Sequence, residues 1–330
     1  GVQLAVCQRS APQTVCLGDS GPGGEAIAAD TLFEIASLSK TVASAFALEF
    51  FAARGIPLSA SVNALFQAAG ADFRLTSTGD PAWADAVTIA HLMNHQALNR
   101  HYVHGVPADG ALPPIADIVR GSAPGREDPI QVISAPGSRF QYSGGGFLVL
   151  ELLIETLAGA SIHALTAAFL QRLGLRHLSF DGQNGAGRRF ADGWFDDGQR
   201  VPAGRLLFPA FAAGAVSSAA DTLAFLRHLG RAFVDRNGSA AISHDTAVQL
   251  VHGRDLGCRE FMGCDVGLGV FVLEAGNNRV IVHQGANEGF RAIYLYVIAG
   301  PDADSGFVLL VNSDNRGVLA IAEMAQILIR

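Results

Sequence analysis

The chain has 330 residues, of which 49% are hydrophobic and 16% charged, and its formal net charge is −7. This composition excludes an intrinsically disordered chain, and the mild acidity without a basic stripe excludes a nucleic-acid-binding surface. The longest apolar run, 206–220, is too short for a transmembrane helix and contains Pro209. We therefore expect a globular protein with no membrane span, built as one large domain or two lobes, whose partner is a small molecule.

One lysine stands out among the 23 basic residues, because every basic residue except Lys40 is an arginine. An amine differs from a guanidinium group in that burial can lower its pKa until it loses its proton near neutral pH. Lys40 is therefore a candidate for a chemical role.

The first 57 residues predict a hairpin followed by a buried helix. Residues 2–8 and 13–19 have the pattern of two strands joined by a turn. Residues 37–54 predict a helix that is apolar nearly all round and therefore buried. Gly55 and Pro57 end this helix in the usual C-terminal order.

The middle of the chain, about 58–250, is mostly helical, with long loops that contain glycine and proline. The clearest helices are 147–158 and 162–173. Ser218 and Asp221 form the pattern of a capping box before a further helix.

From residue 266 onward the pattern changes to strands, separated by tight turns at 277–278 and 301–302. The expected elements are strands at 267–272, 280–283, 290–298 and 306–312, and then a last helix at 316–329.

Strands near both chain ends with helices between them indicate an α/β (α+β) fold, in which one antiparallel sheet is formed from both chain termini and flanked by helices. We expect an α/β sheet lobe made of residues 1–57 plus 260–330. A mainly helical lobe is inserted at 58–259, and the active site is expected at the lobe interface.

The four cysteines form two local pairs in the sequence, Cys7 with Cys16 and Cys258 with Cys264. Neither spacing is that of a zinc site or a CxxC motif. Local disulfides would indicate an oxidising compartment, whereas four buried free thiols would carry no such implication, and both interpretations stay open. A periplasmic or secreted location is slightly favoured over a cytoplasmic one.

Three serine patterns compete for the role of a nucleophile. Ser20 lies in a Gly-Asp-Ser-Gly string that superficially resembles the nucleophile segment of trypsin-like proteases, but in that fold a histidine precedes the serine, and none precedes Ser20. A Gly-Asp-Ser lipase would need a late Asp-x-x-His, which does not occur, and the Gly-x-Ser-x-Gly string of α/β-hydrolases does not occur either. The third pattern is Ser-x-x-Lys, formed by Ser37 and Lys40.

Ser-x-x-Lys places a hydroxyl and an amine one helical turn apart on the same face. Ser37 is expected at a helix N-terminus, where free N–H groups stabilise negative charge. Lys40 begins an apolar helix, so burial is expected to lower its pKa and let it act as a base. The competing interpretation is a solvated lysine at the start of a helix.

The chain resembles the serine β-lactamase and penicillin-binding-protein superfamily, and within it the class C β-lactamase-related hydrolases such as esterases and D-aminopeptidases. The Ser37-x-x-Lys40 pattern after 31–36 looks like the first motif of that superfamily. Three later stretches are similar to further family segments in the right order along nearly the whole chain; these are 87–95, 136–144 and 283–290.

The resemblance implies a role for each matching residue. Ser37 would be the acylated nucleophile, and Lys40 with Tyr142 would act as the base, with a tyrosinate stabilised by the lysine charge. The oxyanion hole would be the backbone N–H groups of Ser37 and Ala286. The implied substrate-binding residues are Gly144, His283, Gly285, whose missing side chain would let the substrate approach the strand, and Asn287.

Two positions depart from the family pattern. The second motif usually reads Tyr-x-Asn, and Gly144 stands at the asparagine position. The third motif usually carries lysine, and here it is His283, which is mostly neutral at pH 7. Both changes weaken the prediction of an efficient β-lactamase or a strict DD-carboxypeptidase, while acyl transfer from a serine is unaffected.

The remaining polar candidates favour structural roles. His91 and His95 share one face of a helix, but no HExxH motif accompanies them, so a buried hydrogen-bonding role is favoured over a metal site, and His101 and His104 do not change this. Arg291 is expected to be a solvated strand residue rather than a clamp for a substrate carboxylate. No metal and no organic cofactor is expected.

The sequence therefore predicts a serine hydrolase that acts through an acyl-enzyme on carboxylic esters or small amides. Three alternatives stay open: a β-lactamase or D-amino-acid peptidase of the penicillin-binding-protein type, a biosynthetic acyltransferase or thioesterase on the same scaffold, and a non-catalytic penicillin-recognising sensor. The oligomeric state and the acyl and leaving groups of the substrate do not follow from the residues.

Overall fold

A computed structural model describes residues 1–21, 23–123, 128–182 and 188–314. The helix predicted at 316–329 lies outside the described residues.

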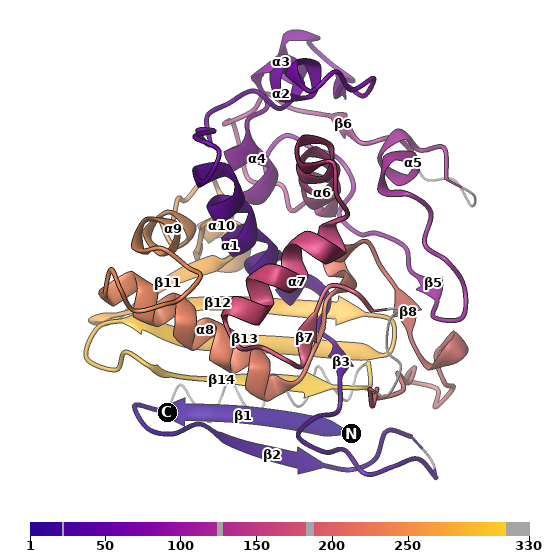
Figure 1. Cartoon of the computed structure of the whole chain (residues 1–330), viewed down its shortest axis with the longest axis vertical. Coiled ribbons are helices and arrows are strands. Elements are labelled where there is room, and N and C mark those ends of the chain that lie inside the picture. Colours follow the sequence, from indigo (N-terminus) through magenta and orange to yellow (C-terminus); the bar gives the residue numbers. More distant parts are fainter. Residues whose placement is uncertain (22, 124–127, 183–187, 315–330) are drawn as a thin grey trace.

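The fold is organised around one antiparallel sheet of seven strands in the order β10-β11-β12-β13-β14-β1-β2 (Figure 1). Strands from both ends of the chain meet in it, because Val2 on β1 faces Val311 on β14. The predicted fold class is therefore confirmed. The strands are β1 (Val2–Gln8), β2 (Gln13–Leu17), β10 (Asp265–Val266), β11 (Phe271–Ala275), β12 (Asn278–Asn287), β13 (Phe290–Ala299) and β14 (Ser305–Val311).

Three small sheets lie outside this sheet. The first contains β3, β9 and β7, the second β4 and β6, and the third β5 and β8. Their bounds are β3 (Phe33–Glu34), β4 (Thr76–Ser77), β5 (Val106–Pro107), β6 (Gln131–Val132), β7 (Leu178–Ser179), β8 (Leu206–Leu207) and β9 (Val216–Ser217).

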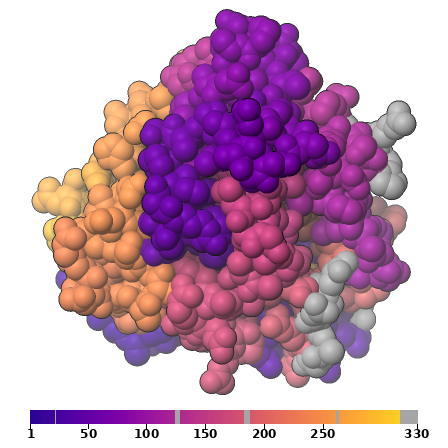
Figure 2. Space-filling view, turned by 45° about the horizontal axis from the view of Figure 1, so that its top comes forward, coloured from indigo at the N-terminus to yellow at the C-terminus, as the bar shows by residue number. Residues whose placement is uncertain are grey.

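The helices form a second layer above the sheet in Figure 1. In the space-filling view, the purple residues of the earlier helices lie at the top and the orange residues of the later helices at the left (Figure 2). Short turns are η1 (Ala36–Leu38), η2 (Pro202–Gly204) and the π-helical turn η3 (Ala210–Gly214). The α-helices are α1 (Ser39–Ala52), α2 (Val62–Ala68), α3 (Ala82–Ala86), α4 (Ile89–Met93), α5 (Ile115–Arg120), α6 (Gly144–Ala158), α7 (Ile162–Arg172), α8 (Ala219–Val234), α9 (His244–Leu250) and α10 (Cys258–Met262).

Helix α1 is buried nearly all round, as its apolar sequence predicts, and Gly55 with φ +63° follows it in the left-handed region. Helix α8 packs on β13, β14 and β1. Helix α8 falls within the residues 58–259 expected for the helical lobe, and it covers part of the sheet.

Two predicted local patterns differ from the structure. The Ser218 hydroxyl caps α8 by accepting from the Asp221 N–H (3.2 Å), but the Asp221 carboxylate accepts from the His177 N–H (2.5 Å) and does not close a capping box. The strand expected from 267 begins only at Phe271, because Gly269 (φ +70°) bends the chain so that its N–H donates to the Met93 carbonyl.

All four cysteines are free thiols. In the β1–β2 hairpin Cys16 faces Gln3, four positions along the strand from Cys7, so their Cα atoms are on the order of 13 Å apart and a disulfide between them is excluded. Cys258 and Cys264 lie in one buried cluster with Val266 and Phe271.

Within the described residues, no single helix is long and apolar enough to cross a membrane. Helices α6 and α7 pass that test only as a pair bent by 90°, by length and composition alone.

Candidate active site

Ser37 lies in the turn η1, immediately before α1, and not within the α-helix that the sequence predicts. Ala36 adopts φ +47°, an uncommon conformation for a residue with a side chain. The Ser39 hydroxyl stabilises the turn, since it donates to the Ala36 carbonyl (2.5 Å) and accepts from the Ala215 N–H (3.0 Å). A strained backbone is thus held in place beside the candidate nucleophile.

The Lys40 amine points at Ser37. Its Nζ lies 2.9 Å from the Ser37 Oγ and also donates to the Ala212 carbonyl. The side chain is 2% exposed, and burial lowers the pKa of Lys40 from 10.5 to about 7. Near neutral pH a large share of the amine is therefore uncharged and able to accept a proton.

The Tyr142 side chain completes this group. Its hydroxyl interacts with the Ser37 side chain, and the Lys40 Nζ lies 5.2 Å from its ring centroid. Burial raises the pKa of Tyr142 above its usual value. The tyrosinate expected from the family resemblance is therefore disfavoured, because the amine of Lys40 loses its proton at a much lower pH than the phenol.

An open strand edge faces the candidate nucleophile. Strand β11 pairs with β12 only as far as Val282, so residues 283–287 of β12 have no partner on that side within the described sheet, and they pack against η1. Ala286 and Asn287 line the cavity in front of Ser37. This edge supplies backbone groups where an oxyanion hole is expected.

Gly285 packs closely against the residues at the start of η1 and does not line that cavity. A Cβ atom at this position would lie 2.5 Å from the Ile35 carbonyl oxygen and 3.1 Å from the Ala36 Cβ. The missing side chain therefore lets the turn that carries Ser37 approach the strand closely. The sequence prediction assigned this close approach to the substrate.

The cavity in front of Ser37 has a volume of about 360 Å³. Five of the predicted residues line it, namely Ser37, Lys40, Gly144, Ala286 and Asn287. His283 is 1% exposed and does not line the cavity, and its ring centroid lies 6.3 Å from that of Tyr142. The structure therefore does not place it at the substrate-binding position expected for it. Burial lowers the pKa of His283 to about 3, which keeps the ring neutral.

Arg291 lines the cavity and is not a free solvated residue. Its Nη1 lies 2.7 Å from the Asp314 Oδ1 and also donates to the carbonyls of Asn287 (2.7 Å) and Phe290 (2.8 Å). Glu288 lines the same cavity. The charge of Arg291 is thus neutralised locally, and the rim carries a further acidic group.

Two buried carboxyl groups were not identified from the sequence. Glu34 accepts from the Leu206 N–H (2.8 Å) and from the Asn287 side-chain amide (2.7 Å), while Glu151 accepts from the Phe211 N–H (2.9 Å). Burial raises the pKa of each to about 8. A single acid within an apolar stretch, as at Glu151 in α6, is the sequence signal that could have identified them.

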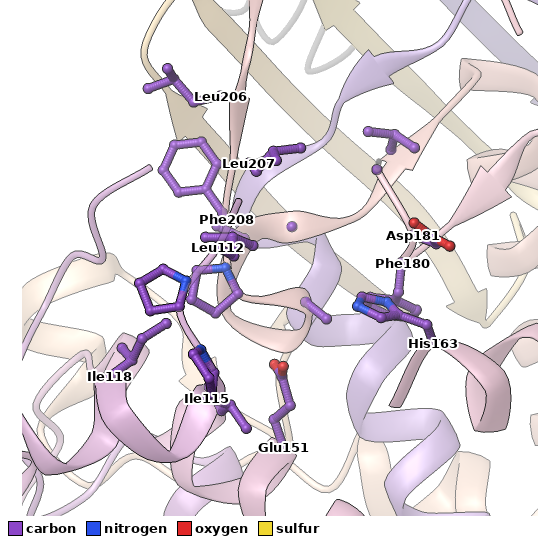
Figure 3. Close-up of a pocket in the computed structure, with 18 of the residues that line it drawn as sticks. Leu112, Ile115, Ile118, Glu151, His163, Phe180, Asp181, Leu206, Leu207 and Phe208 are labelled. Carbon is purple, nitrogen blue, oxygen red and sulfur yellow. The ribbon is translucent and has the colours of Figure 1, made fainter. Parts of the chain in front are cut away.

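These carboxyl groups line a second cavity of about 380 Å³ (Figure 3). Most of its other lining residues are apolar, although Glu155, His163, Asp181 and Arg205 also line it. Figure 3 shows the Glu151 carboxyl pointing into the cavity below Leu112 and Phe208. Phe208 and Ala213 line both cavities, so the segment that contains η3 forms the partition between them.

The histidines that could have suggested a metal have other partners. The His91 ring accepts from the Thr88 N–H (3.2 Å) and closes a capping box at α4, while His95 packs against Tyr142. Among the described residues no group of three or more His, Cys, Asp or Glu side chains is arranged to hold a metal ion.

The model of the Beta-lactamase family matches residues 1–329. The chain belongs to the β-lactamase family. Comparison with curated proteins gave no match.

Solved structures share the fold of this β-lactamase-family chain at low sequence identity. SurE is 22% identical with a TM-score of 0.75, covering 98% of this chain and 70% of that one. EstCE1, described as a hydrolase with promiscuous acyltransferase activity, is 19% identical with a TM-score of 0.74, covering 96% and 89%. The D-amino acid amidase of Ochrobactrum anthropi SV3 with D-phenylalanine is 19% identical with a TM-score of 0.71, covering 94% and 86%.

Proposed function

We propose that this chain is a serine hydrolase that forms an acyl-enzyme at Ser37, with carboxylic esters as the leading substrate class and small amides next. The observation that carries the proposal is the 2.9 Å contact between the Ser37 Oγ and a buried Lys40 amine whose pKa lies near 7. A serine hydroxyl is a weak nucleophile until a neighbouring base accepts its proton.

In the proposed reaction the neutral Lys40 amine takes the Ser37 proton while the Oγ attacks the substrate carbonyl carbon. The resulting oxyanion accepts hydrogen bonds from the backbone N–H groups of Ser37 and Ala286. The neutral Tyr142 hydroxyl then donates its proton to the departing alkoxide and recovers one from Lys40. Water attacks the acyl-enzyme by the reverse path and releases the acid.

The charges around the cavity favour substrates without a carboxylate. Among the described lining residues Arg291 is the one side chain with a permanent positive charge, and Asp314 neutralises it. His283, at the position where β-lactamases carry a lysine, is buried and neutral. A β-lactam carboxylate would therefore find no free cation there, which places β-lactamase activity behind ester hydrolysis.

The second cavity suggests where a bulky acyl group would lie. It adjoins the Ser37 cavity through Phe208 and Ala213, its walls are mostly apolar, and its volume falls in the range of small-ligand pockets. We propose that aryl or branched acyl groups extend past this partition. Ile115→Trp would fill the cavity, so hydrolysis of a phenylbutyrate ester should fall at least about tenfold while acetate hydrolysis changes little.

The test of the function is covalent labelling followed by turnover. A fluorophosphonate probe should add one mass increment at Ser37, and Ser37→Ala should abolish it, while Ser20→Ala serves as the matched serine control. Turnover of p-nitrophenyl esters, D-amino-acid anilides and nitrocefin, with Ser37→Ala as the blank, then ranks the substrate classes. Labelling at Ser20, or turnover that survives Ser37→Ala, would overturn the proposal.

The same assay separates the acyltransferase and sensor alternatives. Added alcohols or amines that yield new esters or amides faster than the free acid forms would identify a transferase. An acyl-Ser37 adduct that persists for hours without turnover would identify a non-catalytic sensor.

A further inference from the structure

His95 occupies an unusual backbone position beside the active site. It follows Asn94, the C-cap residue of α4, and its φ is +60°, in the left-handed region. Its side chain is 1% exposed. Such a conformation in a residue other than glycine is uncommon and is retained where the surroundings enforce it, often at functional sites.

His95 is hydrogen-bonded to the chain on both sides of Tyr142. Its carbonyl oxygen accepts from the Gln141 N–H (2.8 Å), and its ring Nδ1 lies 3.2 Å from both the backbone nitrogen and the carbonyl oxygen of Ser143. The two residues that flank Tyr142 are therefore tied to one residue of a different segment, which limits the rotation of the Tyr142 backbone.

The His95 ring also supports the Tyr142 ring directly. The two rings are stacked, with centroids 4.3 Å apart and planes 22° apart. The His95 Nε2 is buried and has no hydrogen-bond partner in the described ranges. A buried polar atom without a partner is costly, so a residue with only apolar atoms would be favoured here if packing were all that was required.

The His95 ring is uncharged near neutral pH. Burial, followed by the charges of Lys40 and His283, holds its pKa well below the usual value. His95 therefore cannot exchange protons with Tyr142 near neutral pH, and its contribution must come from geometry.

We propose that His95 is a positioning residue that fixes the Tyr142 hydroxyl on the Ser37 Oγ. The inference rests on the proposed function, because it assumes that Tyr142 takes part in the reaction. A misplacement of about 1 Å in such a group can cost on the order of 100-fold in rate.

Two substitutions separate the two kinds of contact. His95→Phe keeps a ring for stacking but removes the hydrogen bond between Nδ1 and the Ser143 backbone. His95→Asn keeps an acceptor near the Nδ1 position and suits the left-handed backbone, but it removes the ring. We expect His95→Phe to lower kcat for an ester about 30-fold with KM within about threefold, and His95→Asn to recover part of that loss.

A double-mutant cycle with Tyr142→Phe distinguishes positioning from general stabilisation. If His95 acts through the Tyr142 hydroxyl, adding His95→Phe to Tyr142→Phe lowers kcat by no more than about twofold further. The pH below which kcat/KM falls should also be the same in the His95 variants as in wild type, because the pKa of Lys40 sets it. The matched control is His91→Phe, which removes the capping contact at Thr88 and should lower the melting temperature without changing kcat.

Three results would overturn the inference: multiplicative losses in the cycle, a pH limb that moves in the His95 variants, or an unchanged kcat in His95→Phe. A structural readout covers the case of an inactive enzyme. The chain has four tyrosines, so ¹³Cζ-tyrosine NMR should show the Tyr142 signal shifted and broadened in His95→Phe. If wild type neither turns over esters nor is labelled at Ser37, the proposed function fails, whereas an active wild type with an additive cycle refutes only the role of His95.

Discussion

Replacing Lys40 with methionine should stabilise the protein near neutral pH while abolishing acylation. Burial lowers the Lys40 pKa from 10.5 to about 7. At about 1.4 kcal/mol per pH unit, this difference corresponds to roughly 5 kcal/mol of folding free energy, and about 4 kcal/mol remains at pH 7, where half of the amine is protonated.

One term opposes this gain in Lys40→Met. The Ala212 carbonyl loses the hydrogen bond from the amine, which costs about 1–3 kcal/mol when the oxygen stays buried. Methionine fills nearly the same volume, so little cavity or strain is added. The expected result at pH 7 is a stabilisation of about 1–3 kcal/mol, so Lys40 is a residue at which the proposed function lowers stability.

The stability difference between wild type and Lys40→Met should change with pH in a direction that the Lys40 pKa determines. Between pH 7 and 10.5 the unfolded wild type binds more protons than the folded form, so wild-type stability rises with pH relative to Lys40→Met. The advantage of the variant should shrink through this window and reverse between about pH 8 and pH 10. Urea unfolding of both proteins at pH 7, 8, 9 and 10 measures it, with Ser37→Ala as a control that retains the amine.

A direct titration is available because Lys40 is the one lysine among the 330 residues. Labelling with ¹³Cε-lysine should give a single side-chain signal that titrates near pH 7, and the acid limb of kcat/KM should follow it. A signal that titrates near pH 10, or a stability difference that does not depend on pH, would refute the reasoning, because Lys40 would then be charged in the folded protein and could not accept the serine proton.

Three further results are expected. Gly285→Ala should lower kcat/KM at least about tenfold and stability by about 1–3 kcal/mol, since the added Cβ meets the turn that carries Ser37; an unchanged ester rate would contradict this. Stability that Glu151 contributes is present below its unfolded pKa of 4.5 and is lost as pH rises through about 8, so Glu151→Gln should unfold with a flatter pH dependence between pH 5 and 8, measured by thermal scans, and parallel curves would exclude the assignment. Oxidation with diamide should remove 2 Da by linking Cys258 to Cys264, read by peptide mapping against a Cys264→Ser control, and a bridge to any other cysteine would contradict the structure.

Much of the fold could be predicted because local patterns and long-range packing agree there. The β1–β2 hairpin, the buried helix α1 and the turns around 277 and 301 follow from residue spacing alone. The lone Lys40 in an apolar stretch also predicted its own burial, since a helix without a polar face has no side to expose to water.

The parts that failed depend on residues that meet only in three dimensions. Strand β11 begins late because Gly269 must pass close to the Lys40 carbonyl of α1, a contact that no local pattern contains. Arg291 was expected in solvent, and only the fold brings Asp314 within 2.7 Å of it. The protonation of Tyr142 depends on burial by several separate segments, which the motif alone does not specify.

The pairing of β1 with β14 has a consequence for how the chain acquires activity. Val2 faces Val311, so the central sheet cannot close until the ribosome has released almost the whole described chain. The turn that carries Ser37 is made early, yet the strand edge it needs, 283–287 of β12, is made late. Such high contact order slows folding, and it also means that no nascent fragment ending before β12 can carry a complete oxyanion hole. Hydrolytic competence should therefore be among the last properties gained during synthesis.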